Sequence, residues 1–153
     1  MITASGGLWE MADTLDGLVC LAWSTFIGDD LTRVETHVID VDVVCSSIAI
    51  SGPSNATVMF FADVAVARQG TSAVLGIAPD ELDDSDIHDV FGEIVNIIGG
   101  NLKGVVSDES IDWRLSLPVV SNAMQHAPGG RLAAEVSFLS TSGFVGCQIL
   151  EHS

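Results

Sequence analysis

Basic residues are scarce in this chain. Five Lys and Arg stand against 21 Asp and Glu, which gives a formal net charge of −16 at pH 7. A surface this acidic repels nucleic acid and anionic lipid, so we expect neither as a partner. Solubility or a salty habitat explains the charge more simply than a specific function does.

Cysteine and histidine are also few, and neither follows the spacing of a metal site. The cysteines are three, each in an apolar run, and the four histidines are isolated from one another. We therefore expect small buried thiols in a reducing cytosol and no metal site. The residues concerned are Cys20, Cys45, Cys147, His37, His88, His126 and His152.

Signals for export or membrane insertion are missing from the sequence. Met1 is not followed by a basic region and an apolar core, so we expect no secretory signal. The longest apolar run, Gly17 to Gly28, is shorter than a membrane span and contains Ser24 and Thr25. The sequence therefore predicts a cytoplasmic protein without a membrane segment.

Apolar residues, in contrast, are plentiful. They make up 48% of the 153 residues, and the mean hydropathy is +0.46. Such a chain is too apolar to be disordered and long enough to bury one substantial core. No region has the composition of a linker, so we predict a single domain over residues 1–153. The excess of apolar surface for a small monomer favours a homo-oligomer.

Hydrophobic periodicity predicts helices and strands in a repeated order. Apolar residues at helical spacing indicate helices, and β-branched runs between turn residues indicate strands. The predicted elements are a helix at 8–27, strands at 38–50 and 56–61, a helix at 63–75, a helix at 85–104, and strands at 111–120, 131–139 and 143–151. This order favours an α+β fold in which two related helix–strand halves share one mostly antiparallel sheet.

The helix predicted at 85–104 carries one polar stripe. Its members recur at steps of three and four, which keeps them on one face of a helix that turns about 100° per residue. They are Asp86, Asp89, Glu93, Asn96, Gly100 and Lys103. The core-facing residues opposite them are Ile87, Phe91, Ile94, Val95, Ile98 and Leu102.

Four glycines distinguish this helix from an ordinary solvated one. They are Gly92, Gly99, Gly100 and Gly104. Each costs roughly 1 kcal/mol against Ala inside a helix, and clearance for an approaching backbone is a physical reason to keep them. The stripe is therefore interpreted as a docking face. The acidic run Asp80 to Asp86 suits the helix N-terminus, with Asp84 or Ser85 as N-cap, better than it suits cation binding.

Glu93 and Asn96 by themselves would be interpreted as an ordinary exposed pair, but they belong to a longer pattern. Asp89 lies four residues before Glu93, Asn96 lies three after it, and Pro118 follows farther on. This pattern resembles the signature helix of the CheC, CheX and FliY family of chemotaxis phosphatases. The run Gly99-Gly100-Asn101-Leu102-Lys103-Gly104 is similar to the CheX branch. The resemblance implies the CheX-like two-layer fold along nearly the whole chain.

The resemblance also implies an activity. Enzymes of this family remove the phosphoryl group from an aspartate of a phosphorylated CheY-like response regulator. The catalytic residues would be Glu93 and Asn96. A neutral carboxamide at Asn96 can position water without repelling phosphoryl oxygens, and an anionic Glu93 suits pairing with the regulator's lysine. Mg²⁺ and the aspartyl phosphate would belong to the partner, so we expect no cofactor of this chain's own.

The other stripe residues are expected at the partner interface. Asp89 and Lys103 would orient the partner or form the rim, Val90 and Ile97 would supply apolar contact, and Gly100 would allow close approach.

CheX-like proteins pair as homodimers, which fits the apolar excess. CheC-type members carry a second site on the first helix, where this chain offers Gly6, Glu10 and Asp13, so that a carboxylate replaces the Asn. We therefore expect one site per chain. An alternative remains, namely a non-catalytic receiver-binding or scaffold domain of the same fold, in chemotaxis or another two-component pathway.

Overall fold

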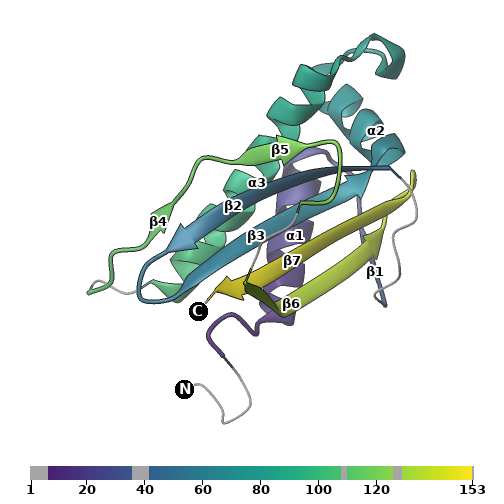
Figure 1. The fold of residues 1–153 in the computed structure, drawn as a ribbon. Helices are drawn as coiled ribbons and strands as arrows, with labels where there is room; N and C mark the ends of the chain where they lie inside the picture. The colour runs from purple at the N-terminus through teal and green to yellow at the C-terminus, as the bar shows by residue number, and fades with distance from the viewer. Residues whose placement is uncertain (1–6, 36–41, 108–109, 126–128, 153) are drawn as a thin grey trace.

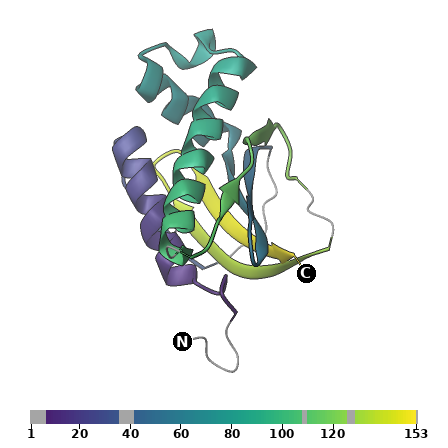
Figure 2. The same ribbon diagram turned by 90° about the vertical axis from the view of Figure 1, so that its left-hand side faces the viewer.

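The computed structural model describes residues 7–35, 42–107, 110–125 and 129–152. They form two layers, with α1 and α3 on one face of an antiparallel sheet (Figures 1 and 2). The helices are α1 (Ala12–Phe26), α2 (Val64–Leu75), the 3-10 turn η1 (Pro79–Glu81) and α3 (Asp84–Val106). The strands are β1 (Thr32–Val34), β2 (Val43–Ser51), β3 (Asn55–Asp63), β4 (Arg114–Leu115), β5 (Val119–Ser121), β6 (Gly130–Leu139) and β7 (Phe144–His152). None of the described helices is long and apolar enough to cross a membrane.

The topology confirms the predicted α+β class and the two related halves. The sheet order is β1-β6-β7-β3-β2-β4, and β5 also pairs with β2. The hairpin β2–β3 of the first half and the hairpin β6–β7 of the second half meet along β3 and β7. β1 pairs with the second hairpin, and β4 and β5 pair with the first. Each half thus contains a long helix and a hairpin. The short strands of each half pair with the hairpin of the other half.

Alternating strand residues build the core beneath the helices, because successive strand side chains point to opposite faces of a sheet. On β2, Val44, Ile48 and Ile50 belong to the main core, which also includes the fully buried Trp9 and Trp23. The opposite face carries a smaller buried cluster. Its members are Cys45, Met59, Phe61 and Phe144.

α3 approaches β2 very closely at Gly99. A Cβ added at Gly99 would lie 2.8 Å from Ile48 Cγ2, a distance that real Cβ atoms essentially never show. At Gly100, the next residue, an added Cβ would meet nothing within 4 Å. Gly99 therefore lets α3 lie close to the sheet, whereas Gly100, which belongs to the polar stripe, faces open space.

The strand predicted at 111–120 is broken in two. β4 and β5 are separated by Ser116, Leu117 and Pro118, and β5 continues beyond the proline. Pro118 has no N–H to donate to a ladder. At the break, the Ser116 hydroxyl accepts the N–H of Ala49 at 2.9 Å. The prediction of one continuous strand at 111–120 is therefore wrong, because the pairing with β2 stops at Leu115 and resumes at Val119, after the proline.

Three other boundaries differ from the sequence-based expectation. α1 begins at Ala12 rather than at residue 8. β1 was not expected, because three residues are too few for an alternating pattern to show. The strand predicted at 38–50 begins at Val43 in the structure, and its residues 38–41 lie outside the described residues.

The cysteines are free thiols, as their spacing predicts. Cys45 and Cys147 are buried, whereas Cys20 is half-buried. Burial raises the pKa of Cys45 to about 11, and burial with a hydrogen bond to Asp16 raises that of Cys20 to about 11. Both thiols stay protonated at neutral pH, which makes them poor nucleophiles.

Substituting the two adjacent glycines tests how α3 is seated. Gly99→Ala should lower the free energy of unfolding by about 1–3 kcal/mol, because the new methyl group overlaps Ile48. Gly100→Ala is the matched control and should raise the free energy of unfolding by up to about 1 kcal/mol, since it adds helix propensity in open space. Urea unfolding followed by circular dichroism measures both. Effects of the same sign would show that Gly99 does not seat the helix.

Candidate functional site on α3

A capping box starts α3. The Asp83 carboxylate accepts the N–H of Asp86 at 3.0 Å, and the Asp86 carboxylate accepts the N–H of Asp83 at 3.1 Å. The Ser85 hydroxyl and the Asp86 N–H both donate to Asp83, which lowers the pKa of that carboxyl group. The N-cap is therefore Asp83, one residue before the predicted Asp84 or Ser85, and the acidic run begins the helix as expected.

The polar stripe of α3 faces away from the sheet. Asp89, Glu93 and Asn96 are exposed, whereas Gly100 and Lys103 are half-buried. Helical spacing predicts this placement, since the intervening apolar residues are drawn into the core. Asn101, which lies off the stripe, is also exposed.

Glu93 and Asn96 line one open groove of about 490 Å³. α3 supplies one side of this groove, and the segment between β4 and β5 with the start of β5 supplies the other. The lining residues are His88, Asp89, Gly92, Glu93, Asn96, Leu117, Pro118 and Val120. We call residues 116–121 the strap. The structure thus brings both predicted catalytic residues together with Asp89 and the motif residue Pro118.

The strap passes over α3 at Gly92. A Cβ added at Gly92 would lie 3.5 Å from Pro118 Cγ and 3.6 Å from Val120 Cγ2, which is ordinary van der Waals contact. The glycine predicted to give clearance to a partner therefore faces the chain's own strap, and a small side chain would fit there.

A side-chain network fixes the end of the strap. His88 Nε2 donates to Asn122 Oδ1 at 2.8 Å, and Asn122 Nδ2 donates to Asp84 Oδ2 at 3.1 Å. On the sheet side, Gln125 Nε2 donates to the carbonyl oxygens of Cys45 at 3.0 Å and Val119 at 3.1 Å. The strap is therefore tied both to the first turns of α3 and to β2.

Two residues predicted at the partner interface lie elsewhere or only at its border. Val90 is 4% exposed and belongs to the main core, so it offers no surface to a partner. Its position one residue after Asp89 rotates it by about 100°, toward the sheet. Ile97 is half-buried and packs against the core. The apolar surface at the groove comes from Leu117, Pro118 and Val120 instead.

Sequence reasoning missed His88, Leu117, Val120 and Asn122 as parts of the site. His88 was set aside as an isolated histidine, although it lies four residues before Gly92 and hence beside it on the helix. The three others are on a segment more than 20 residues away, and only the position of Pro118 in the motif hinted that this segment comes near.

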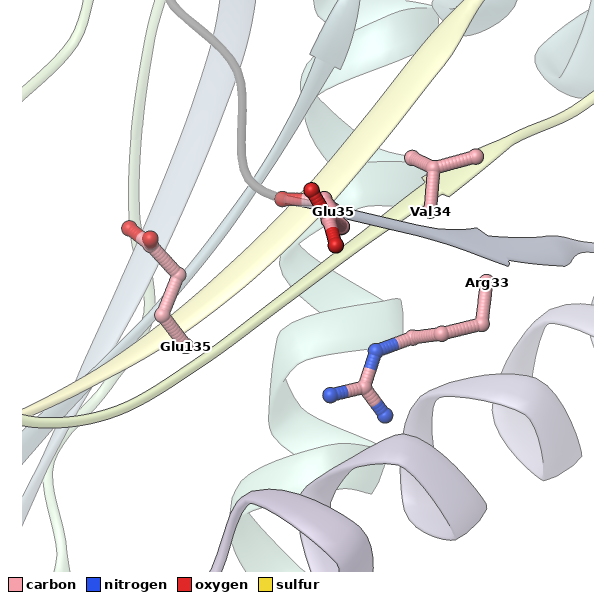
Figure 3. Close-up of a pocket in the computed structure, with 5 residues that line it drawn as sticks. Arg33, Val34, Glu35 and Glu135 are labelled. Carbon is pink, nitrogen blue, oxygen red and sulfur yellow. The ribbon is translucent and has the colours of Figure 1, made fainter.

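A second groove lies beside β1 and β6. Its lining includes the carboxylates of Glu35 and Glu135 together with Val34 and Ser137 (Figure 3). Arg33 extends toward α1, where it pairs with Asp16 (Figure 3). This groove has no carboxamide in its lining and contains none of the residues of the Asp89–Pro118 pattern, so it is not the site that the pattern indicates.

The first half offers no equivalent of the α3 pair at the position expected for a second site. Glu10 precedes α1, and its carboxylate accepts from the Gly7 N–H and pairs with Arg131. Arg131 also pairs with Glu151. Glu10 is therefore engaged in an ion-pair network, and one site per chain stays a prediction.

Comparison with known proteins identifies the family. The family model for "Chemotaxis phosphatase CheX" matches residues 44–138, a range that contains α3, the strap and the groove. The chain belongs to the CheX family. This membership confirms the predicted family of chemotaxis phosphatases. No curated protein sequence matches the chain.

Solved CheX structures share the fold at low sequence identity. CheX from Desulfovibrio desulfuricans is 19% identical, with a TM-score of 0.74 over 94% of this chain and 99% of that chain. CheX from Vibrio vulnificus is 19% identical, with a TM-score of 0.77 over 98% and 100%. CheX from Borrelia burgdorferi, solved in complex with CheY, BeF3 and Mg²⁺, is 13% identical, with a TM-score of 0.71 over 92% and 97%. These likenesses confirm the CheX-like fold.

Removing the side chain that fixes the strap should weaken the fold measurably. Asn122→Ala breaks the bonds to His88 and Asp84 and should lower the free energy of unfolding by about 0.5–1.5 kcal/mol. Asn101→Ala is the control, because Asn101 is exposed and has no side-chain hydrogen bond to the described part of the chain. Urea midpoints compare the two variants. Equal midpoints for wild type and Asn122→Ala would show that the network contributes nothing.

Proposed function

We propose that Glu93 and Asn96 are the catalytic pair with which this CheX protein hydrolyses the aspartyl phosphate of a CheY-like response regulator. The observation that carries the proposal is their placement. Both side chains are exposed, lie one turn apart on α3 and line the same open groove. Neither makes a hydrogen bond or an ion pair with the described residues, so both are available to a partner.

Asn96 suits the role of positioning the attacking water. Its carboxamide oxygen accepts a hydrogen bond from water, and its NH2 group donates to an oxygen of the partner. Because the group is neutral, it does not repel the phosphoryl oxygens. The water oxygen forms a bond to phosphorus, and the bond from phosphorus to the aspartate oxygen breaks. The products are inorganic phosphate, which takes up the water proton or passes it to solvent, and the free aspartate.

Glu93 suits a cationic group of the partner rather than the phosphate itself. A carboxylate beside phosphoryl oxygens is repelled, but it forms a strong charge-assisted hydrogen bond with an ammonium group. The regulator's active-site lysine is such a group. Asp89, four residues earlier, adds a second negative charge on the same face. Lys103 lies about 10 Å beyond Asn96 along the helix axis, where it can contact an acidic rim of the partner.

Mg²⁺ is assigned in this proposal to the response regulator. Among the described residues, no group of three or more His, Cys, Asp or Glu side chains is arranged to hold a metal ion. Divalent cations bound beside a phosphoryl group neutralise its developing charge. This chain would then contribute only the water-positioning and lysine-pairing groups, and Gly100, with open space around it, would allow the regulator's backbone to approach.

We also propose that the protein acts as a homodimer in the cytoplasm, within chemotaxis or a related two-component pathway. Large apolar side chains are exposed on several elements away from the groove. They are Leu21, Val105, Leu132 and Leu139. Apolar surface of this kind favours association. The free thiols also fit a reducing compartment.

Asn96→Ala tests the catalytic role. The wild-type protein should accelerate the decay of an acyl-phosphate-labelled response regulator, measured with Mg²⁺ present. The rate of catalysed dephosphorylation should be about 100-fold or more lower with the Asn96→Ala variant than with the wild type. Binding to the BeF3-activated regulator should persist, because one exposed carboxamide contributes little to the contact area. Asn101→Ala, an exposed carboxamide on the same helix but outside the groove lining, should retain full activity.

The same experiment separates the enzyme from the scaffold. If the wild-type protein binds a regulator tightly without accelerating its decay, the domain is a receiver-binding scaffold. Full activity of Asn96→Ala would show that Asn96 is not catalytic. Other residues of the groove would then have to position the water.

The dimer is tested by sedimentation equilibrium at several protein concentrations. The expected mass is twice the 16.0 kDa of one chain. A mass of one chain at concentrations up to about 100 times those used in the phosphatase assay would contradict the proposal, because mass action favours the dimer as concentration rises.

A further inference from the structure

Leu117 is the most exposed of the large apolar side chains in the described part of the chain. It is 85% exposed and lines the groove that contains Glu93 and Asn96. Single exposed leucines are common on protein surfaces. Leu117 differs because it lies beside Pro118 and Val120, which line the same groove from the strap. The groove therefore has a polar side on α3 and an apolar side on the strap.

The strap presents Leu117 on a constrained backbone. Residues 114–125 contain no glycine, and Pro118 restricts the position after Leu117. On the other side, the Ser116 N–H donates to the Ala49 carbonyl oxygen at 2.9 Å, and the Ser116 hydroxyl accepts from the Ala49 N–H at 2.9 Å. Asn122 ties the far end of the strap to α3. A side chain held in this way loses little backbone freedom when a partner binds.

Electrostatics give no reason for a phosphorylated protein to approach this groove. The chain has a net charge of −16, and Asp89 and Glu93 lie in the groove itself. A phosphoryl group is also anionic, so long-range forces oppose the encounter. Contact between Glu93 and a lysine forms only at short range. Binding energy must therefore come largely from apolar surface removed from water next to the catalytic pair.

We propose that Leu117 is the apolar anchor of the response-regulator interface and a determinant of which regulator is accepted. Its occupant is an aliphatic or aromatic side chain on the regulator surface next to the aspartyl phosphate. The proposal rests on the proposed function, because the groove is assigned to the regulator through Glu93 and Asn96. It adds that affinity and selectivity come from Leu117, whereas hydrolysis comes from Glu93 and Asn96.

Steady-state dephosphorylation by Leu117 variants tests the anchor. With a regulator on which the wild-type protein is active, Leu117→Ala should raise KM about 10-fold or more and leave kcat within twofold, since the anchor contributes to binding alone. Leu117→Met keeps volume and hydrophobicity and should restore a near-wild-type KM. The rise in KM should persist at 0.5 M NaCl, because burial of apolar surface is not screened by salt.

Val119→Ala is the matched control. Val119 is 60% exposed and lies two residues from Leu117, but it is absent from the groove lining among the described residues. It should leave both KM and kcat unchanged. Circular dichroism should show all three variants folded, because the substituted side chains are exposed.

The outcomes separate this inference from the proposed function. A KM for Leu117→Ala within twofold of wild type, while Asn96→Ala is inactive, would overturn the anchor and keep the catalytic pair. Equal rises in KM for Leu117→Ala and Val119→Ala would also overturn it, because the groove would not distinguish the two. If the wild-type protein neither binds nor dephosphorylates any response regulator, both proposals fail.

Discussion

The packing of α3 against β2 at Gly99 is the contact on which the candidate site depends. With a glycine there, the helix backbone lies so near the sheet that an added Cβ would be 2.8 Å from Ile48 Cγ2. That approach fixes both the height and the rotation of the helix. Ile94 and Ile98 are then fully buried, and Glu93 and Asn96, on neighbouring positions, must face outward.

The second constraint is the strap, which converts an exposed helix face into a groove. Pro118 interrupts the pairing with β2, and the Ser116 hydroxyl replaces one lost ladder bond. The chain can therefore bend toward α3 without leaving the Ala49 N–H unpaired. Pro118 lies over Gly92, where an added Cβ would be 3.5 Å from Pro118 Cγ. The polar chemistry of α3 and the apolar side chains of the strap thus come from separate segments that tertiary packing brings together.

The two halves of the chain share a plan but differ in function. Each supplies a long helix on the same face of the sheet and a short strand to the other half's hairpin. In the second half, Glu93 and Asn96 make no hydrogen bond or ion pair with the described residues. In the first half, Glu10 is joined to Arg131, and Asp16 is joined to Arg33. The corresponding carboxylates of the first half are therefore engaged in ion pairs within the chain.

Patterns along the sequence were enough to predict the class of fold, the polar stripe of α3 and the family. Helical periodicity and the spacing from Asp89 through Asn96 to Pro118 are local or one-dimensional properties, so they can be recognised without a structure. The sequence also indicated an N-cap at Asp84 or Ser85, close to the observed N-cap Asp83. Other features could be seen only in the folded chain. They are the broken strand, the burial of Val90, the different surroundings of Gly99 and Gly100, and the contributions of His88, Leu117 and Asn122 to the site. Each of these depends on which segments meet in space. A distance between α3 and a strap more than 20 residues away is set by how the whole sheet packs, and no local pattern records it.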